Sequence, residues 1–363
     1  MNWVHTKFAD ALKFYNGKAG KVSESGTYPV YGSNGIIGYC EEPLFENAII
    51  IGRVGAYCGA ILYCSDKFWA SDNTIVVKPT AGYDVVFLSY LLRIMNLNQF
   101  AGGSAQPLLT HGWIKPIAVK IPPLPIQKKI AGILSAYDDL IETNLKRIKL
   151  LEEMAQITYK EWFVRLRFPN HESTTINPET ALPKGWAKTK LKEVLTLNYG
   201  RALKADTRVE GNIPVYGSSG IVGAHNEALI KECGIIIGRK GNVGSVFWSH
   251  DSFYPIDTVY FVTSKHMLPF LYFALKNSKF NNSDAAVPGL NRDAAYAVEI
   301  MLPSEAVEKK FSSIAQKNFK AIQLLEMKNI RLREARDILM PRLMTGVIDV
   351  ESYHPALLLK EAA

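Results

Sequence analysis

"YPVYGSNGIIG", residues 28–38, returns almost unchanged as "IPVYGSSGIVG" at residues 213–223. The likeness extends beyond this phrase, because "AIIIGRVG" at 48–55 has a counterpart in "GIIIGRKG" at 234–241. The repeats of solenoid proteins are far shorter than this separation, at about 20–50 residues. The sequence therefore predicts a chain that contains two copies of one domain.

Each copy has two unlike halves. The first half is rich in short β-branched runs separated by Gly, Pro, Asn and Asp, such as 73–79 and 257–262, and this pattern predicts strands joined by tight turns. Segments 84–96 and 267–277 have an apolar spacing nearer 3.6 and predict short helices. We therefore expect each first half to be a globular mixed α/β domain.

The second half of each copy has the pattern of a long helix. Between Ile126 and Val164 only Gly132 interrupts a run of apolar residues spaced by threes and fours, and a similar run extends from Val307 to Pro341, where we expect it to end. Such a helix spans roughly 60 Å, which is too long for a core helix of a small bundle and favours pairing of the two helices with each other. The residues predicted to pair the helices or to dock a partner are Ile130, Ile133, Tyr137, Leu140, Leu151, Phe311, Ile314, Ile322, Leu325 and Leu332.

These halves predict a fold of the α/β class, in which two strand-rich domains alternate with two long helices. The polar, proline-bearing stretch after the first helix has no periodicity and is interpreted as a linker. The predicted order is domain 1 at 1–122, helix 1 at 123–167, linker at 168–185, domain 2 at 186–303, helix 2 at 304–350 and a tail at 351–363.

The charge of the chain is compatible with an anionic partner, and the motifs that it lacks argue against several classes of enzyme. The net charge of +8 is typical of many proteins that bind a polyanion. The sequence lacks a phosphate loop, an HExxH or GxSxG motif, and the Asn-Pro-Pro-aromatic motif of amino-methyltransferases. The four cysteines have no metal-binding spacing, and neither a signal segment nor a membrane span is evident. We therefore expect a cytoplasmic, non-catalytic chain that binds no metal or cofactor.

The order of these parts resembles the specificity subunit of type I restriction–modification systems. The matching motifs are the repeated tyrosine–glycine phrase, "IPPLPIQKKIAGIL" at 121–134 with "LPSEAVEKKFSSIA" at 302–315, and "LMPRLMTGVIDV" at 339–350. Family members usually carry an acidic residue before the glutamine of the helix start, where this chain has Ile126. The resemblance covers residues 3 to 350.

The resemblance implies a function in DNA recognition. Each strand-rich domain would be a target recognition domain that reads one half of a split site in double-stranded DNA, while the long helices pack antiparallel and hold the domains apart. Two methyltransferase subunits would carry S-adenosylmethionine and methylate adenine, and motor-nuclease subunits would complete a restriction complex. A duplicated interaction module with no role in DNA binding is the alternative, and a steep salt dependence of DNA affinity would distinguish the two.

The duplication divides the candidate DNA-binding residues into two groups. Residues identical in both copies cannot encode two different half-sites, so they are predicted to be scaffold or phosphate contacts. Arg53 and Arg239 are the best of these, although a structural ion pair to Asp72 and Asp257 is an equal alternative. The shared candidates are Tyr31, Ser33 and Arg53 with Tyr216, Ser218 and Arg239.

Base readout is expected where the copies differ and remain polar or aromatic. The amide of Gln106 suits adenine, and Lys240 or Arg292 would suit guanine. Solvated loops are the alternative interpretation of each. These candidates are Asn34, Tyr57, Gln106 and His111 in the first copy, and Ser219, Lys240, Asn242 and Arg292 in the second.

Overall fold

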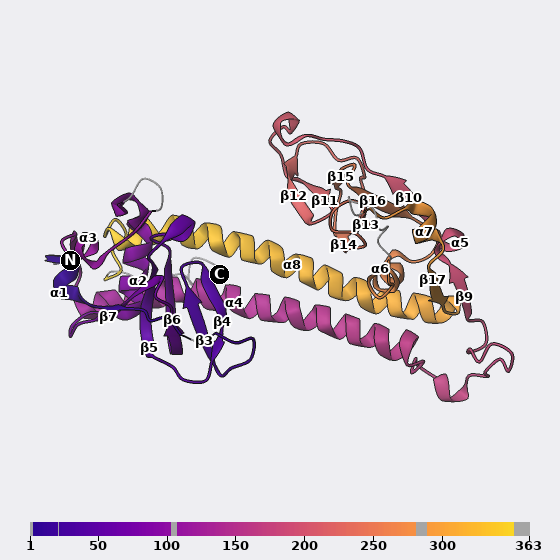
Figure 1. The fold of residues 1–363 in the computed structure, drawn as a ribbon, viewed down its shortest axis with the longest axis horizontal. Helices are drawn as coiled ribbons and strands as arrows, with labels where there is room; N and C mark the ends of the chain where they lie inside the picture. The colour runs from indigo at the N-terminus through magenta and orange to yellow at the C-terminus, as the bar shows by residue number, and fades with distance from the viewer. Residues whose placement is uncertain (1–2, 21, 103–106, 281–288, 352–363) are drawn as a thin grey trace, which may run out of the picture. The chain divides into compact units, whose positions relative to one another are not determined.

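The computed structural model describes residues 3–20, 22–102, 107–280 and 289–351. Its contacts divide the chain into two compact units (Figure 1). Unit 1 comprises residues 1–143 and 329–363, and unit 2 comprises residues 144–328. Both boundaries fall inside long helices, so each unit combines one strand-rich domain with a segment of each long helix.

Unit 1 is built on a six-stranded sheet in the order β2-β7-β5-β6-β3-β4, with a separate pair β1-β8. Helix α2 packs against strands of the larger sheet. The strands are β1 Val4–Lys7, β2 Leu12–Asn16, β3 Tyr28–Gly32, β4 Gly35–Cys40, β5 Phe45–Gly52, β6 Ile61–Ala70, β7 Thr74–Pro79 and β8 Ala118–Ile121; the short helices are α1 Phe8–Ala11, α2 Val85–Ile94 and α3 His111–Ile114.

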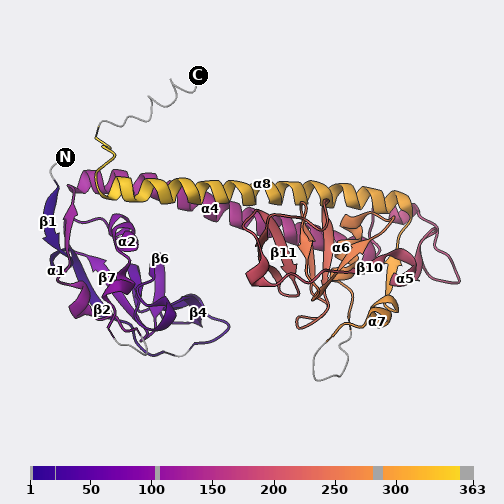
Figure 2. The same ribbon diagram turned by 90° about the horizontal axis from the view of Figure 1, so that it is seen from above.

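Unit 2 repeats this arrangement, with the corresponding strands divided into a four-stranded sheet β10-β16-β13-β14 and a three-stranded sheet β12-β11-β15, beside the pair β17-β9. Helix α6 packs against β14 and the long helices (Figure 2). The strands are β9 Ala187–Lys190, β10 Thr196–Tyr199, β11 Ile213–Gly217, β12 Gly220–His225, β13 Gly234–Gly238, β14 Val246–Ser249, β15 Tyr254–Pro255, β16 Val259–Thr263 and β17 Glu299–Leu302; the short helices are α5 Leu191–Val194, α6 Leu268–Lys276 and α7 Arg292–Tyr296.

The repeated phrase forms the same hairpin in both units. In unit 1 it supplies β3 and β4, and in unit 2 it supplies β11 and β12. The residue after the two-residue turn is a glycine in both hairpins, Gly35 at φ +117° and Gly220 at φ +99°, a region that side chains with a Cβ disfavour. Each hairpin then pairs in parallel with a later strand, through Val30–Trp69 in unit 1 and Val215–Tyr254 in unit 2. The predicted duplication is therefore confirmed in three dimensions.

The two long helices are α4 (Leu124–Tyr159), followed by a π-helical turn at Lys160–Val164, and α8 (Glu305–Met344). The prediction that Pro341 ends the second helix is wrong, because α8 continues to Met344. A proline in the last turn removes only its own N–H from the helix, so the three residues beyond it can remain helical. Among the helices of the described residues, none combines the length and the apolarity that a membrane span requires.

A buried polar side chain near the start of each long helix fixes it to the strand-rich domain. Gln127 is 1% exposed, accepts a hydrogen bond from the backbone N–H of Asp84 at 2.8 Å and donates to the carbonyl of Pro122 at 2.9 Å. Glu308 has the equivalent role in unit 2, where it accepts from the N–H of Met267 at 2.7 Å. Both bonds satisfy a free N–H at the start of a short helix, α2 or α6.

The helices run antiparallel where they pair. In unit 2, Phe311 contacts Tyr159 with ring centroids 5.8 Å apart, and seven residues later Asn318 Nδ2 lies 3.5 Å from the carbonyl of Leu151. Residue numbers thus rise along α8 as they fall along α4. Figure 1 shows the two helices side by side within each unit.

The predicted pairing face needs one correction. Leu140, predicted to pair the helices, is 52% exposed, whereas its neighbour Ile141 is 7% exposed. The buried face steps by four residues from Tyr137 to Ile141 and then continues through the buried Asn144. Since a straight helix has 3.6 residues per turn, a mixture of steps of three and four is expected, but their order depends on packing.

These neighbours provide a matched test of the pairing. Ile141→Asp would place a carboxylate in the apolar face, and we expect it to lower the free energy of unfolding by about 3 kcal/mol or more. Leu140→Asp should change it by less than about 0.5 kcal/mol because that side chain is exposed. Urea titration followed by far-ultraviolet circular dichroism measures both, and equal shifts of the unfolding midpoint would contradict the observed pairing face.

Candidate nucleic-acid interface

Arg53 and Arg239 each follow the last residue of a central strand, β5 or β13. The glycines before them allow another segment to approach the strand end. A Cβ on Gly52 would lie 2.3 Å from the carbonyl oxygen of Tyr57, and a Cβ on Gly238 would lie 2.1 Å from that of Asn242. These shared glycines are therefore structural, and they hold a loop directly beside each arginine.

In unit 2, Arg239 belongs to a cluster of cations and aromatic rings. Its guanidinium carbon lies 5.0 Å from the ring centroid of Tyr199 and 5.8 Å from that of Tyr260. The Arg292 guanidinium lies 5.3 Å from the same Tyr199 ring. Tyr199 is 51% exposed, so two guanidinium groups meet at a ring that solvent can reach.

Hydrogen bonds fix the position of this cluster. The N–H of Leu290 donates to the carbonyl of Arg239 at 2.7 Å, and the hydroxyl of Tyr260 donates to the carbonyl of Leu290 at 3.1 Å. Burial, followed by the hydrogen bond with Tyr199, raises the pKa of Tyr260 to about 12. That hydroxyl is therefore protonated at neutral pH and remains a donor, while the neighbouring arginines are cationic.

The alternative of an arginine–aspartate ion pair is not what the structure shows. Arg239 Nη1 donates to the backbone carbonyl of Asp257 at 2.8 Å, and it is Lys240 whose Nζ lies 3.8 Å from the Asp257 carboxylate. Within the described residues, the Arg53 guanidinium forms no ion pair with Asp72 or another carboxylate. The two arginines thus keep much of their capacity to bind an anion.

Unit 1 carries a related but different cluster at the same place. The N–H of Leu109 donates to the carbonyl of Arg53 at 2.8 Å, which reproduces the bond between Leu290 and Arg239. His111 packs on Phe14 with centroids 5.4 Å apart, and Lys115 Nζ lies 5.5 Å from the same ring. Burial, and then the charges of Lys115 and Arg53, lowers the pKa of His111. The imidazole is therefore neutral at pH 7, whereas Arg292, the corresponding residue of unit 2, is charged.

The strand ladders show where the two clusters diverge. Tyr199 is paired with Tyr260 across β10 and β16, and the corresponding pair across β2 and β7 is Asn16 with Ile75. The aromatic pair of unit 2 is thus replaced by a small amide and an aliphatic residue. The same backbone presents a shared arginine beside different neighbouring side chains, which is the arrangement required for two readers of different sequence.

The remaining predicted residues lie in three settings. Tyr216 is only 6% exposed and Tyr31 is half-buried against Phe68, which fits the scaffold role, one of the two roles predicted for the shared residues. Ser33 donates to the carbonyl of Asn73 at 2.7 Å, and the carbonyl of Ser218 accepts from Ser245, so both of these shared serines anchor loops. The exposed candidates are Asn34, Tyr57, Ser219, Lys240, Asn242 and Arg292, while Gln106 lies outside the described residues.

Sequence reasoning missed the aromatic members of both clusters. Tyr199, Tyr260 and Phe14 lie on strands and have the spacing of ordinary core residues. The sequence signal for these positions is the glycine that follows the edge strand in each copy, Gly17 and Gly200. The structure shows why a glycine is needed there: a Cβ would lie 1.9 Å from a carbonyl oxygen at Gly17 and 2.1 Å from one at Gly200. Within the described part of the chain, no group of His, Cys, Asp and Glu side chains could hold a metal ion.

Comparison with known proteins assigns this architecture to a family. The model of the type I restriction modification DNA specificity domain matches twice, at residues 3–153 and 183–334. The chain therefore belongs to the family of type I restriction–modification specificity subunits, which recognise DNA sequences.

Individual relatives agree with this assignment. The chain is 25% identical over 347 residues to the MjaIX specificity subunit of Methanocaldococcus jannaschii, covering 86% of this chain and 80% of the relative. It is 36% identical over 129 residues to the EcoprrI specificity subunit of Escherichia coli, a match that spans 35% of this chain and only 32% of that relative. The fold is similar to the crystal structure of the S subunit from M. genitalium, with a TM-score of 0.66, 18% identity, and coverage of 94% of this chain and 96% of the other.

Two substitutions in the unit 2 cluster test whether Arg239 positions the DNA and Arg292 reads its sequence. We expect Arg239→Ala to weaken binding to target and random DNA by the same factor and to reduce the slope of log affinity against log salt by about 1, because one phosphate contact is lost. Arg292→Ala should instead weaken target binding by about 1–3 kcal/mol and reduce the ratio of target to random affinity. Fluorescence anisotropy at several salt concentrations measures both.

Lys317→Ala, at an exposed lysine of α8, is the control for a general loss of positive charge. Arg239→Lys keeps the charge and loses the planar stacking on Tyr199, so it should retain the salt slope. An unchanged affinity in both alanine variants would exclude the cluster from the DNA interface.

Proposed function

We propose that this chain is the non-catalytic DNA-reading subunit of a type I restriction–modification complex, in which each strand-rich domain reads one half of a bipartite target. The observation that carries the proposal is the pair of equivalent clusters, Arg53 with His111 and Arg239 with Arg292, on one repeated scaffold. A shared arginine supplies sequence-independent affinity, and the differing neighbours supply sequence preference.

The long helices are the proposed docking surface for the catalytic partners. In unit 2, a groove of about 440 Å³ runs along the helix pair and is lined mainly by apolar side chains. Leu150, Met154 and Leu324 are 63%, 47% and 46% exposed, which is unusual for three neighbouring large apolar residues on a free surface. Arg147 and Lys328 also line the groove, so an acidic, apolar partner surface would be complementary.

We assign these partners as two methyltransferase subunits that carry S-adenosylmethionine and methylate adenine, with motor-nuclease subunits as a further addition. Each unit contains a segment of both long helices, so each unit offers one helix-pair surface. Two partners per chain follow from this duplication. The chain itself contributes DNA recognition, and a cytoplasmic location follows from the location of its substrate.

Reconstitution of the full chain with its methyltransferase subunit tests the proposal. We expect one chain to assemble with two partners and to confer site-specific adenine methylation, whereas the chain alone should neither methylate DNA nor bind S-adenosylmethionine. The double variant Leu150→Asp with Leu324→Asp should remove one of the two partners, because it places carboxylates in the groove of unit 2 alone.

Native mass spectrometry measures the stoichiometry, and methylation of target DNA measures the activity. Lys149→Ala, an exposed position of α4 that does not line the groove, is the matched control. Methylation by the isolated chain, or a one-to-one complex formed by the unaltered protein, would overturn the proposal.

A further inference from the structure

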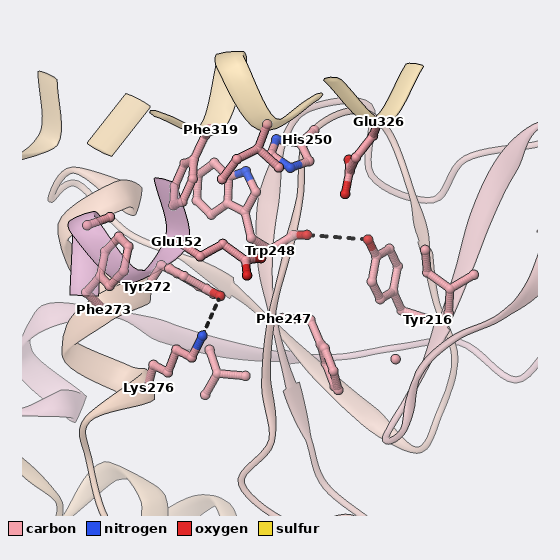
Figure 3. Close-up of a pocket in the computed structure, with 15 residues that line it drawn as sticks. Glu152, Tyr216, Phe247, Trp248, His250, Tyr272, Phe273, Lys276, Phe319 and Glu326 are labelled. Atoms are coloured by element: carbon pink, nitrogen blue, oxygen red, sulfur yellow. Dashed lines mark hydrogen bonds between the residues drawn. The ribbon is translucent and has the colours of Figure 1, made fainter. Parts of the chain in front are cut away.

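Unit 2 contains a cavity that the DNA-reading function does not use. It has a volume of about 560 Å³ and lies between the β11–β12 hairpin, β14, α6 and the two long helices (Figure 3). Aromatic side chains form most of its wall, with Tyr216, Phe247, Trp248, Tyr272 and Phe319 among them. The faces of such rings carry negative partial charge and attract cations.

Two glutamates at this cavity have no cationic partner. Glu152 on α4 and Glu326 on α8 both line it, and neither forms a salt bridge with any described residue. Burial, and then the charge of Glu152, raises the pKa of Glu326 above its ordinary value. As whole residues both glutamates are exposed to solvent, so their carboxylates form an open, acidic part of the cavity lining.

The other titratable groups of the cavity do not neutralise the charge of the two glutamates. Burial lowers the pKa of His250, so its imidazole is neutral at pH 7. Lys276 is an exposed residue whose Nζ lies 3.4 Å from the hydroxyl of Tyr272 and 5.5 Å from its ring centroid, and Figure 3 shows that bond. With two carboxylates and one ammonium, the lining carries a net charge of −1 (−2 + 1).

The corresponding junction in unit 1 contains its own guanidinium. Asp138 lies eleven residues after Gln127, as Phe319 lies eleven after Glu308, so the two positions correspond. In unit 1, Arg336 forms a hydrogen-bonded ion pair with Asp138, which also accepts from the hydroxyl of Tyr90 at 2.6 Å.

Among the described residues that the two long helices contribute to the cavity lining in unit 2, none is cationic. Phe319 replaces the aspartate and stacks on Phe273 of α6, with centroids 5.8 Å apart and planes at 11°. The residues of α4 that line the cavity are Glu152 and Ala155, an acid and a small residue. An arginine joins the domain to the helices in unit 1, while the junction in unit 2 is a cavity lined by aromatic side chains and two carboxylates.

We propose that this cavity of unit 2 binds a monovalent organic cation, a guanidinium or alkylammonium group, held by Glu152 and Glu326 among the aromatic side chains of Tyr216, Phe247 and Trp248 that line it. The net charge of the lining matches one such cation and disfavours phosphates and other anions. The aromatic wall favours a planar or alkylated cation over a hydrated metal ion. A protein side chain and a free metabolite could both supply this group.

Calorimetric titration of the full chain with propylguanidinium tests the proposal. We expect saturable binding of one ligand per chain, at least about tenfold tighter than that of propylurea, the neutral compound of the same shape. The double variant Glu152→Gln with Glu326→Gln should abolish this preference. It removes a repulsion between carboxylates, so the protein should fold at least as well as the original.

Glu153→Gln, at an exposed residue of α4 that does not line the cavity, is the control and should retain the preference. Titration of the complex with the partner subunits distinguishes the sources of the cation. A partner side chain in the cavity would block propylguanidinium, whereas a metabolite site would remain open. Absence of binding, equal affinity for both compounds, or a preference that survives the double glutamine variant would overturn the proposal. None of these outcomes depends on DNA reading.

Discussion

The antiparallel contact between α4 and α8 is the constraint on which the rest of the structure depends. Each strand-rich domain has a core that its own copy does not complete. Leu343 and Met344, at the end of α8, are 2% exposed in the core of unit 1, and Tyr159 and Phe163, near the end of α4, are 5% and 3% exposed in that of unit 2. Each core thus requires the end of the other copy's helix, so neither copy is an independent domain.

Two buried polar residues, Gln127 and Glu308, fix the position of each long helix against its strand-rich domain. Gln127 and Glu308 are both almost completely buried, and each bonds to the start of a short helix in its own strand-rich domain. Loss of such a bond would leave a buried donor or acceptor without a partner, which costs about 1–3 kcal/mol. A long helix displaced by one residue would lose this bond, so each anchor fixes its helix in register with its own strand-rich domain. Duplication has preserved the anchor while allowing its chemistry to differ.

Much of this architecture could be predicted from the sequence, because repetition is visible without coordinates. The repeated phrase predicts the two hairpins, and the apolar spacing predicts both long helices. The exact pairing face could not be predicted, since Leu140 and Ile141 are equally apolar and only the packing decides which is buried. The contact between the Arg239 guanidinium and the Tyr199 ring could not be predicted either. Tyr199 lies 40 residues away on another strand (239 − 199) and has the sequence pattern of a core residue.

The comparison of the two units also explains how one scaffold can acquire two specificities. The strand ladder is retained at the sites of Asn16 and Tyr199, so a substitution there changes the chemistry of the surface without moving the backbone. In the proposed division of roles, the shared arginines would maintain the affinity for the phosphate backbone while their neighbours change. Recognition can therefore diverge in one copy independently of the other.

The most direct test of this account is the genome-wide methylation motif of cells that express a hybrid chain with its partner subunits. In the hybrid, residues 186–300 are replaced by a second copy of residues 3–120. The two long helices run in opposite directions and are unchanged, so we expect an inverted repeat of the half-site now read by the first domain, with nearly the same spacer. A direct repeat, or the original asymmetric motif, would contradict the division of reading between the two copies.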